Sequence, residues 1–246
     1  MKKPALLFNM SRLLGKGLFN TLFNLKVEGR ENIPLDRKYI LISNHLNWSD
    51  PFYLYIIFPA NPRLIFVAEY EGIYDNIYKK KFIDLMGKPI LPIDRDDPVS
   101  RISALKSMYK IVKSGEILSV FPEGRLGHRE GELFPFHIGV FSISRKLNVP
   151  ILPVAIAGSK ELSFRKTIHI RIGKLINCHQ DETDEQFARR SAKVMQKLLP
   201  EYPGDGPFPG LGNWMTGFCQ GELRDFEGER DLIISKMRRK NNMKDR

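Results

Sequence analysis

The chain has 246 residues, of which 42% are hydrophobic, and its formal net charge is +11. This length and composition predict a globular protein of one large or two small domains and argue against a disordered chain, while the basic excess favours an anionic partner such as nucleic acid, a membrane surface or a phosphorylated substrate. The only cysteines, Cys178 and Cys219, are far apart, which argues against a disulfide framework and favours a reducing cytoplasm.

Residues 4–25 are predicted to form one amphipathic helix, because leucines recur at steps of three and four. Arg12 and Lys16 are expected on its polar face, and no acid precedes Glu28. Such a helix is typical of the surface of an anionic bilayer, although it could also pack on its own domain. The chain lacks an apolar run of roughly 20 residues, so we expect peripheral attachment to the cytoplasmic face of a membrane and no transmembrane span.

From residue 26 onward, strand-like and helix-like patterns alternate. This alternation predicts an α/β fold with a mostly parallel central sheet flanked by helices. The predicted strands are 39–43, 63–68, 88–93, 117–121, 151–157 and 167–172, and the predicted helices lie near 51–58, 76–86, 98–113, 138–147 and 183–198. We therefore divide the chain into the helix at 1–25, a main domain at 26–200, and a Gly/Pro-rich loop with a basic tail at 201–246.

Polar turns follow three of the predicted strands. They are "SNHLNWSD" after 39–43, "DRDDP" after 88–93 and "PEGRLGHREG" after 117–121. Ligands of open parallel sheets bind outside the carboxyl ends of the strands. The three turns are therefore expected to converge on one pocket.

The first turn contains a histidine and an aspartate. His45 is a candidate general base, and Asp50 could fix its tautomer and stabilise the imidazolium. The alternative is that Asp50, followed by Pro51, is a helix N-cap and that His45 is a core histidine. No Gly-x-Ser-x-Gly motif is present, and neither cysteine lies in a strand-to-helix turn. A substrate hydroxyl could then be the nucleophile, which indicates direct acyl transfer without an acyl-enzyme.

The other two turns contain candidate phosphate ligands. Arg95 could bind a phosphate through two parallel hydrogen bonds, or pair with neighbouring aspartates. Glu123 lies in a stiff turn, and Gly124 allows the backbone to approach a ligand closely. Arg125 adds positive charge. The alternative for this loop is a solvated segment in which Arg125 neutralises Glu123.

Taken together, these blocks resemble the 1-acylglycerol-3-phosphate acyltransferase family, whose first motif is His-x4-Asp. The matching blocks, in the family's order, are "NHLNWSD" (Asn44–Asp50), "GKPILPIDR" (Gly87–Arg95), "FPEG" (Phe121–Gly124) and "VPILPVAIAG" (Val149–Gly158). The resemblance covers roughly residues 26–175 and does not extend beyond about residue 200.

The resemblance implies roles for particular residues. His45 would be the general base and Asp50 would orient it, while Arg95, Glu123 and Gly124 would form the region that binds the acceptor phosphate. Arg125 stands one position earlier than the family's arginine, so its contact with phosphate stays open. The residues expected to line the acyl pocket are Pro122, Val149, Pro150 and Pro153.

The reaction implied is transfer of a fatty acyl group from a thioester to the free hydroxyl of lysophosphatidic acid or a related lysophospholipid. The donor would be acyl-CoA or acyl carrier protein, with no metal and no other cofactor. The alternatives are a glycerol-3-phosphate or other alcohol acyltransferase, a thioester hydrolase and a lipid-binding protein without activity. Nucleic-acid binding is not expected, because no recognition motif combines aromatic and basic residues.

Overall fold

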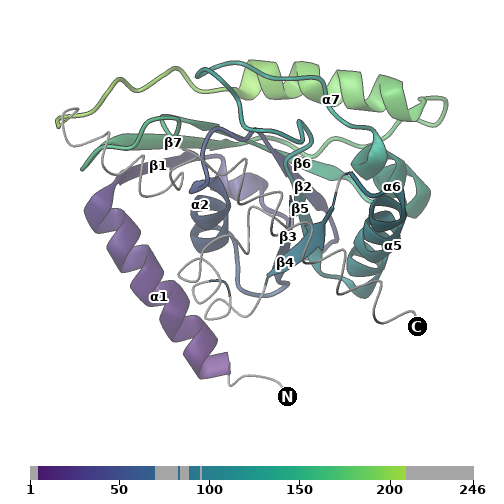
Figure 1. Ribbon diagram of the computed structural model, residues 1–246, viewed down its shortest axis with the longest axis horizontal. Helices are drawn as coiled ribbons and strands as arrows, with labels where there is room; N and C mark the ends of the chain where they lie inside the picture. The colour runs from purple at the N-terminus through teal and green to yellow at the C-terminus, as the bar shows by residue number, and fades with distance from the viewer. Residues whose placement is uncertain (1–4, 70–82, 84–88, 95, 209–246) are drawn as a thin grey trace.

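The computed structural model describes residues 5–69, 83, 89–94 and 96–208. One seven-stranded sheet forms the centre, and helices cover both of its faces (Figure 1). The strands are β1 Asn24–Glu28, β2 Ile40–Ser43, β3 Leu64–Glu69, β4 Ile90–Ile93, β5 Ile117–Val120, β6 Ile151–Ala157 and β7 Thr167–Ile172. The helices are α1 Ala5–Leu22, α2 Asp50–Ile57, α5 Pro98–Ser114, α6 Gly139–Leu147, α7 Asp184–Leu198 and the short 3-10 helix η1 Arg30–Asn32.

The strand order is β1-β7-β6-β2-β5-β3-β4. The five strands from β6 to β4 are parallel to one another, and β7 pairs antiparallel with β6 and parallel with β1. The predicted α/β fold with a mostly parallel sheet is thus confirmed, and so is each predicted strand. Four of the predicted helices are confirmed as α2, α5, α6 and α7, whereas the helix predicted near 76–86 falls almost wholly outside the described residues.

The prediction of one helix over residues 4–25 is wrong at its end. Helix α1 stops at Leu22, and residues from Asn24 onward form β1, which lies beside β7 with Asn24 opposite Thr167. Leu25 continues the leucine spacing of the helix, but Leu25 and Val27 also alternate with polar residues as a strand does. Pairing with a strand about 140 residues later decides between the two patterns, and the local sequence does not contain that information.

Arg12 also lies elsewhere than expected. Its guanidinium is half-buried against α2, lies over the Tyr55 ring at 5.0 Å, and donates to the backbone carbonyls of Tyr55 and Phe58. The predicted position on a solvated polar face is therefore wrong. None of the helices in the described part of the chain is long and apolar enough to cross a bilayer.

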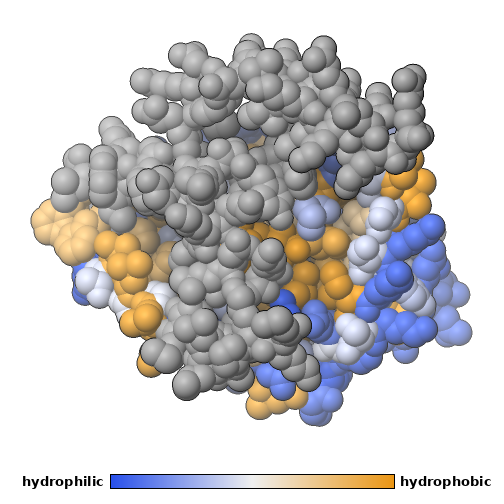
Figure 2. Space-filling view, turned by 60° about the horizontal axis from the view of Figure 1, so that its bottom comes forward, coloured by the Kyte–Doolittle hydropathy of each residue, from blue (hydrophilic) through white to orange (hydrophobic). Residues whose placement is uncertain are grey.

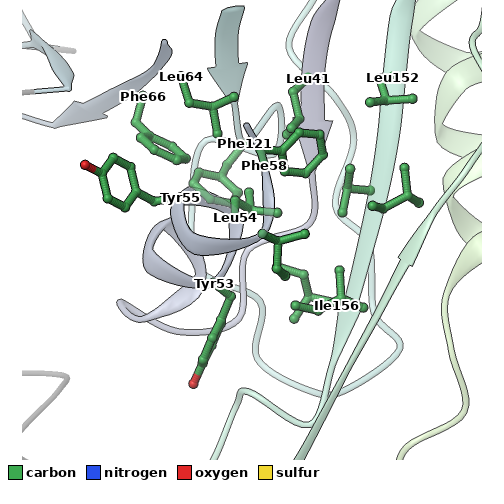
Figure 3. Close-up of a cluster of buried hydrophobic side chains, with 14 of the residues drawn as sticks. Leu41, Tyr53, Leu54, Tyr55, Phe58, Leu64, Phe66, Phe121, Leu152 and Ile156 are labelled. Carbon is green, nitrogen blue, oxygen red and sulfur yellow. The ribbon is translucent and has the colours of Figure 1, made fainter. Parts of the chain in front are cut away.

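Two hydrophobic layers hold the helices against the sheet. On one face α1 and α2 pack through residues such as Phe19 and Tyr53, whose rings meet edge to face at 5.5 Å (Figure 3 shows the core beneath α2). On the other face α5, α6 and α7 bury residues that include Phe141 and Phe187. Strand β2 supplies both layers, because successive side chains of a strand point to opposite faces.

The connections after β2 and β5 leave the sheet on opposite faces. Chain from β2 passes to α2 on one face, and chain from β5 passes to α6 on the other. Because β2 and β5 are adjacent and parallel, their connections diverge at the carboxyl ends of the two strands, which is where open parallel sheets bind ligands, and we call this place the crevice. The turns that contain His45 and Glu123 both begin at this crevice.

Candidate active site

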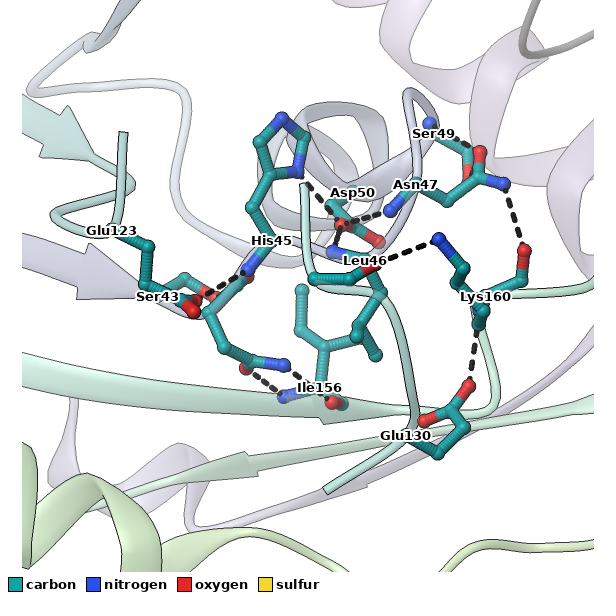
Figure 4. A network of polar contacts seen from close by, with 12 residues as sticks. Ser43, His45, Leu46, Asn47, Ser49, Asp50, Glu123, Glu130, Ile156 and Lys160 are labelled. Carbon is teal, nitrogen blue, oxygen red and sulfur yellow. Dashed lines mark hydrogen bonds and ion pairs between the residues drawn. The ribbon is translucent and has the colours of Figure 1, made fainter. Parts of the chain in front are cut away.

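The loop that contains His45 is fixed to the sheet by the residue before it. The buried side chain of Asn44 donates to the Ile156 carbonyl at 2.9 Å and accepts from the Ile156 N–H at 2.8 Å. Both groups belong to β6, the strand next to β2. This two-way amide pairing sets where the chain leaves β2, and with it the starting position of His45 (Figure 4).

Asp50 is directed back toward this loop. One oxygen, Oδ2, accepts hydrogen bonds from His45 Nδ1 at 2.9 Å, from the Leu46 N–H at 2.6 Å and from the Asn47 N–H at 2.8 Å. The residue is fully buried. The alternative of a helix N-cap is excluded, because Asp50 is the first residue of α2 and the N-cap position belongs to Ser49. The backbone N–H groups fix the carboxylate, and the carboxylate fixes the histidine.

This contact determines which nitrogen of His45 can react. A carboxylate at Nδ1 favours the tautomer that has its proton there, so Nε2 keeps its lone pair. Nε2 has no hydrogen-bond partner within the described ranges, and it points away from Asp50 in Figure 4. The His45 side chain is 20% exposed, whereas that of Asp50 is 0% exposed. The pair therefore offers one accessible basic nitrogen supported by a buried anion.

Phe121, which follows β5, holds the plane of the imidazole. The two rings stack with their centroids 4.0 Å apart and their planes inclined by 16°. Stacking on one side and the Asp50 hydrogen bond at the edge leave the ring little rotational freedom. The sequence alone gave no indication of this contact, because it joins residues from two different turns.

Glu123 supports the same loop through the backbone. Its Oε1 accepts from the His45 N–H at 3.2 Å, and its Oε2 accepts from the Phe134 N–H at 2.7 Å. Burial raises the pKa of Glu123 to about 7, against the lowering effect of these two hydrogen bonds. The alternative in which Arg125 neutralises Glu123 is not supported, because Arg125 contacts His128 and the Phe134 ring instead. Because both oxygens face backbone donors, the geometry gives Glu123 a positioning role, and its predicted place beside a phosphate stays a prediction.

A second brace, formed by Lys160, was not predicted. Lys160 Nζ donates to the Gly127 carbonyl at 2.7 Å, and the Gly127 N–H donates to the His45 carbonyl at 2.6 Å. Asn47 Nδ2 donates to the Lys160 carbonyl at 3.3 Å. Lys160 thus ties together the turns that follow β2, β5 and β6.

Glu130 holds Lys160 in turn. Its carboxylate accepts from the Gly158 and Lys160 N–H groups, each at 3.0 Å, and burial raises its pKa. Glu130 lies in the polar turn after β5 and Lys160 in the loop after β6, but no sequence motif assigns a role to either residue. Asn44 and Asn47 lie within the polar turn "SNHLNWSD", so that turn was a usable signal for both.

Of the other predicted phosphate ligands, the structure describes Arg125 and Gly124 but not Arg95. Arg125 is exposed, donates to His128 Nε2 at 2.7 Å and lies over the Phe134 ring at 4.3 Å. Gly124 adopts a φ of 68°, a conformation that favours glycine, so the turn depends on this residue. Arg95 lies outside the described residues.

The residues expected to line the acyl pocket do not gather in one place. Pro122 is buried where β5 ends, and Pro153 lies within β6 opposite Ile42. Val149 and Pro150 precede β6, at the amino edge of the parallel strands, whereas His45 follows the carboxyl edge. The structure therefore does not bring Val149 and Pro150 to the crevice, because the apolar block that contains them crosses the whole sheet.

Comparisons with known proteins agree on one family for this chain. Residues 24–157 match the Acyltransferase family model. The 1-acyl-sn-glycerol-3-phosphate acyltransferase of Bacillus subtilis is 30% identical over 71% of this chain and 84% of its own. The Saccharomyces cerevisiae protein of the same name is 32% identical over 77% of this chain and 63% of its own. The chain spans less of the chloroplastic Brassica napus relative, 39% of its length, at 29% identity.

A solved structure has the same fold. The crystal structure of the 1-acyl-sn-glycerophosphate (LPA) acyltransferase PlsC from Thermotoga maritima superposes with a TM-score of 0.62 at 24% identity. The match covers 77% of each chain. The α/β arrangement around the crevice is therefore shared with a solved protein.

Proposed function

Because the chain belongs to the 1-acylglycerol-3-phosphate acyltransferase family, we propose that it moves a fatty acyl group from a thioester to the free hydroxyl of a lysophospholipid. Lysophosphatidic acid is the proposed acceptor, and acyl-CoA or acyl carrier protein is the proposed donor. The observation that carries the proposal is the 2.9 Å contact between His45 Nδ1 and the buried Asp50 carboxylate, which leaves Nε2 accessible.

The proposed reaction uses His45 twice. Nε2 takes the proton of the acceptor hydroxyl as that oxygen attacks the thioester carbonyl carbon. The carbon–sulfur bond then breaks, and the imidazolium returns the proton to the departing thiolate. Asp50 stabilises the imidazolium between the two steps. General-base catalysis of this kind contributes about 10²–10⁴-fold, and positioning of the two substrates supplies much of the rest.

The acceptor phosphate is assigned to the positive side of the crevice. Arg125 leaves the β5 turn beside Glu123, and its exposed guanidinium is suited to bidentate phosphate binding. Arg95 keeps its sequence-based assignment as the second phosphate ligand. No metal and no further cofactor is expected, and both expectations remain predictions.

Peripheral attachment to an anionic membrane is part of the proposal. Large apolar side chains are exposed on α1, since Leu13, Leu14 and Leu18 are 72%, 71% and 56% exposed. Apolar surface also gathers at the left of Figure 2, the side on which Figure 1 places α1. A surface helix that directs leucines outward fits insertion into lipid headgroups. Titration with liposomes and with DNA at several salt concentrations tests this partner against nucleic acid.

The decisive experiment is mass spectrometry of the products. Purified protein receives lysophosphatidic acid, glycerol 3-phosphate or other lysophospholipids, each with acyl-CoA or acyl carrier protein as donor. Phosphatidic acid as the main product supports the proposal. Acylated glycerol 3-phosphate or another ester would assign a different acceptor, and free fatty acid alone would assign a thioester hydrolase. No product with any pair would indicate a binding protein.

A further inference from the structure

Helix α5 exposes a strip of apolar side chains. Val99, Ile102, Leu105 and Tyr109, spaced three and four residues apart, are 73%, 56%, 41% and 36% exposed. The N-cap residue of the neighbouring α6, Ile138, is 44% exposed. The buried side of α5 already packs on the sheet, so this strip is additional to the core. We call these five residues the α5 strip.

The α5 strip is continuous across the two helices. A Cβ placed on Gly139, the first residue of α6, would lie 3.1 Å from Leu105 Cδ2, so the helices touch at this point. Figure 1 shows α5 and α6 side by side, and Figure 2 shows apolar next to strongly hydrophilic surface on the same side of the molecule. Contiguous exposed apolar surface of this kind marks an interaction site.

The charges of α5 indicate what covers the strip. The helix contains Arg101, Lys106, Lys110 and Lys113 and no acidic residue. Within the described part of the chain, none of these four side chains forms an ion pair. Cations that have no ion pair among the described residues, placed beside apolar side chains, match a surface that is anionic outside and apolar beneath.

One end of the strip also lies at the catalytic edge of the sheet. Helix α5 begins just after the carboxyl end of β4, and α6 begins where the His137 N–H donates to the Pro122 carbonyl at 2.8 Å, beside the end of β5. These strands are parallel to β2, from which His45 follows. A surface that docked on Val99 and Ile138 would therefore approach the edge at which an amphipathic acceptor has to enter.

We propose that the α5 strip is a second membrane-contact surface, which docks on an anionic bilayer independently of α1. The inference rests on the proposed function in that it explains how a lysolipid reaches the crevice. A second copy of the chain is the less favourable occupant. A two-fold contact through α5 would bring two helices, each with four cations and no acidic residue, against one another, whereas anionic lipids neutralise such cations.

The test measures binding to vesicles by co-sedimentation. The full chain is mixed with vesicles of phosphatidylcholine alone or with about one third phosphatidylglycerol. One variant combines Lys106→Glu with Lys110→Glu, and a second combines Val99→Ser with Ile102→Ser. The matched control combines Lys193→Glu with Lys197→Glu, which makes the same charge reversal at the same spacing on exposed positions of α7.

We expect both α5 variants to bind anionic vesicles at least ten-fold more weakly than wild type. Each basic residue at such a surface strengthens binding roughly five-fold, and each exposed apolar side chain adds apolar area that lipid can bury. The α7 control should bind within about three-fold of wild type. Thermal unfolding verifies that the variants fold. Wild-type binding by either α5 variant, or equal loss in the α7 control, overturns the proposal. A fall in wild-type oligomer size caused by Val99→Ser with Ile102→Ser overturns it in favour of a second copy.

Turnover separates this proposal from the proposed function. With a short-chain lysophosphatidic acid that stays monomeric in solution, the α5 variants should keep wild-type turnover, because they leave the crevice intact. If the wild type itself shows no acyl transfer, the proposed function fails while the vesicle result still stands. If the α5 variants lose turnover of the soluble acceptor, the strip belongs to the active site and the proposal is overturned.

Discussion

Asp50→Asn tests whether the buried charge drives the reaction. The asparagine has the same shape, and its amide oxygen can still accept from the Leu46 and Asn47 N–H groups. Hydrogen bonds to a charged acceptor are worth roughly 1.5–3 kcal/mol and neutral ones roughly 0.5–1.5 kcal/mol, so weakening these two should cost about 1–3 kcal/mol of folding free energy. The protein should therefore stay folded.

The effect on turnover should be larger than the effect on folding. Without the carboxylate, the His45 imidazolium loses the negative charge that stabilises it, although the amide oxygen can still accept from Nδ1. We expect kcat to fall about 10²–10⁴-fold, which corresponds to about 3–5 kcal/mol in the barrier. KM for lysophosphatidic acid should change less than about three-fold, because Asp50 is buried and does not reach the acceptor.

The assay follows release of free thiol from acyl-CoA in the presence of lysophosphatidic acid, with urea unfolding in parallel. Asp97→Asn is the matched control, since Asp97 also precedes a proline at a helix start but acts as the N-cap of α5, a role that asparagine fills equally well. If folded Asp50→Asn turned over within three-fold of wild type, or if Asp97→Asn lost as much, the reasoning would be refuted.

Three further predictions concern the supports of the site. For Glu123, the folded-state pKa of about 7 lies above the ordinary 4.5, so its stabilising effect is present below pH 4.5 and is lost as the pH rises through 7. Between pH 4.5 and 8, wild type should therefore lose up to about 3 kcal/mol more of its free energy of unfolding in urea than Glu123→Gln does. Parallel pH curves for the two proteins would contradict this. Asn44→Leu leaves the Ile156 N–H and carbonyl unpaired and should cost about 2–6 kcal/mol in urea unfolding, a loss below 1 kcal/mol arguing against the brace. Lys160→Met removes the donor to Gly127 and should lower kcat about ten-fold with KM nearly unchanged, whereas a change confined to KM would assign Lys160 to substrate binding.

Local patterns predicted most of the architecture. Strands such as β6, buried at every position, read as continuous apolar runs, and α5 is marked at both ends by Asp97-Pro98 and Gly115. What local patterns could not predict depends on pairing across the chain. Strand β1 exists because β7 lies beside it, and Arg12 turns inward because the end of α2 supplies carbonyl acceptors.

The site shows the same division. The spacing of His45 and Asp50 between a strand end and a helix start was enough to predict that they meet, and they do at 2.9 Å. The Phe121 stack and the Lys160 brace join separate turns, so neither contact can be predicted from one segment of the sequence alone. The apolar block at Val149 led to a wrong prediction. Val149 and Pro150 were expected in the acyl pocket but lie at the amino edge of the sheet, because composition does not say which end of a strand faces the crevice.

The most direct test of the account is a double-mutant cycle on His45 and Asp50. Initial rates of phosphatidic acid formation are measured for wild type, His45→Ala, Asp50→Asn and the double variant. If the carboxylate acts only through the imidazole, His45→Ala should lose at least 10²-fold, and adding Asp50→Asn should cost almost nothing more. Losses that multiply, or a His45→Ala protein as fast as wild type, would contradict the claim that the two residues work as one base.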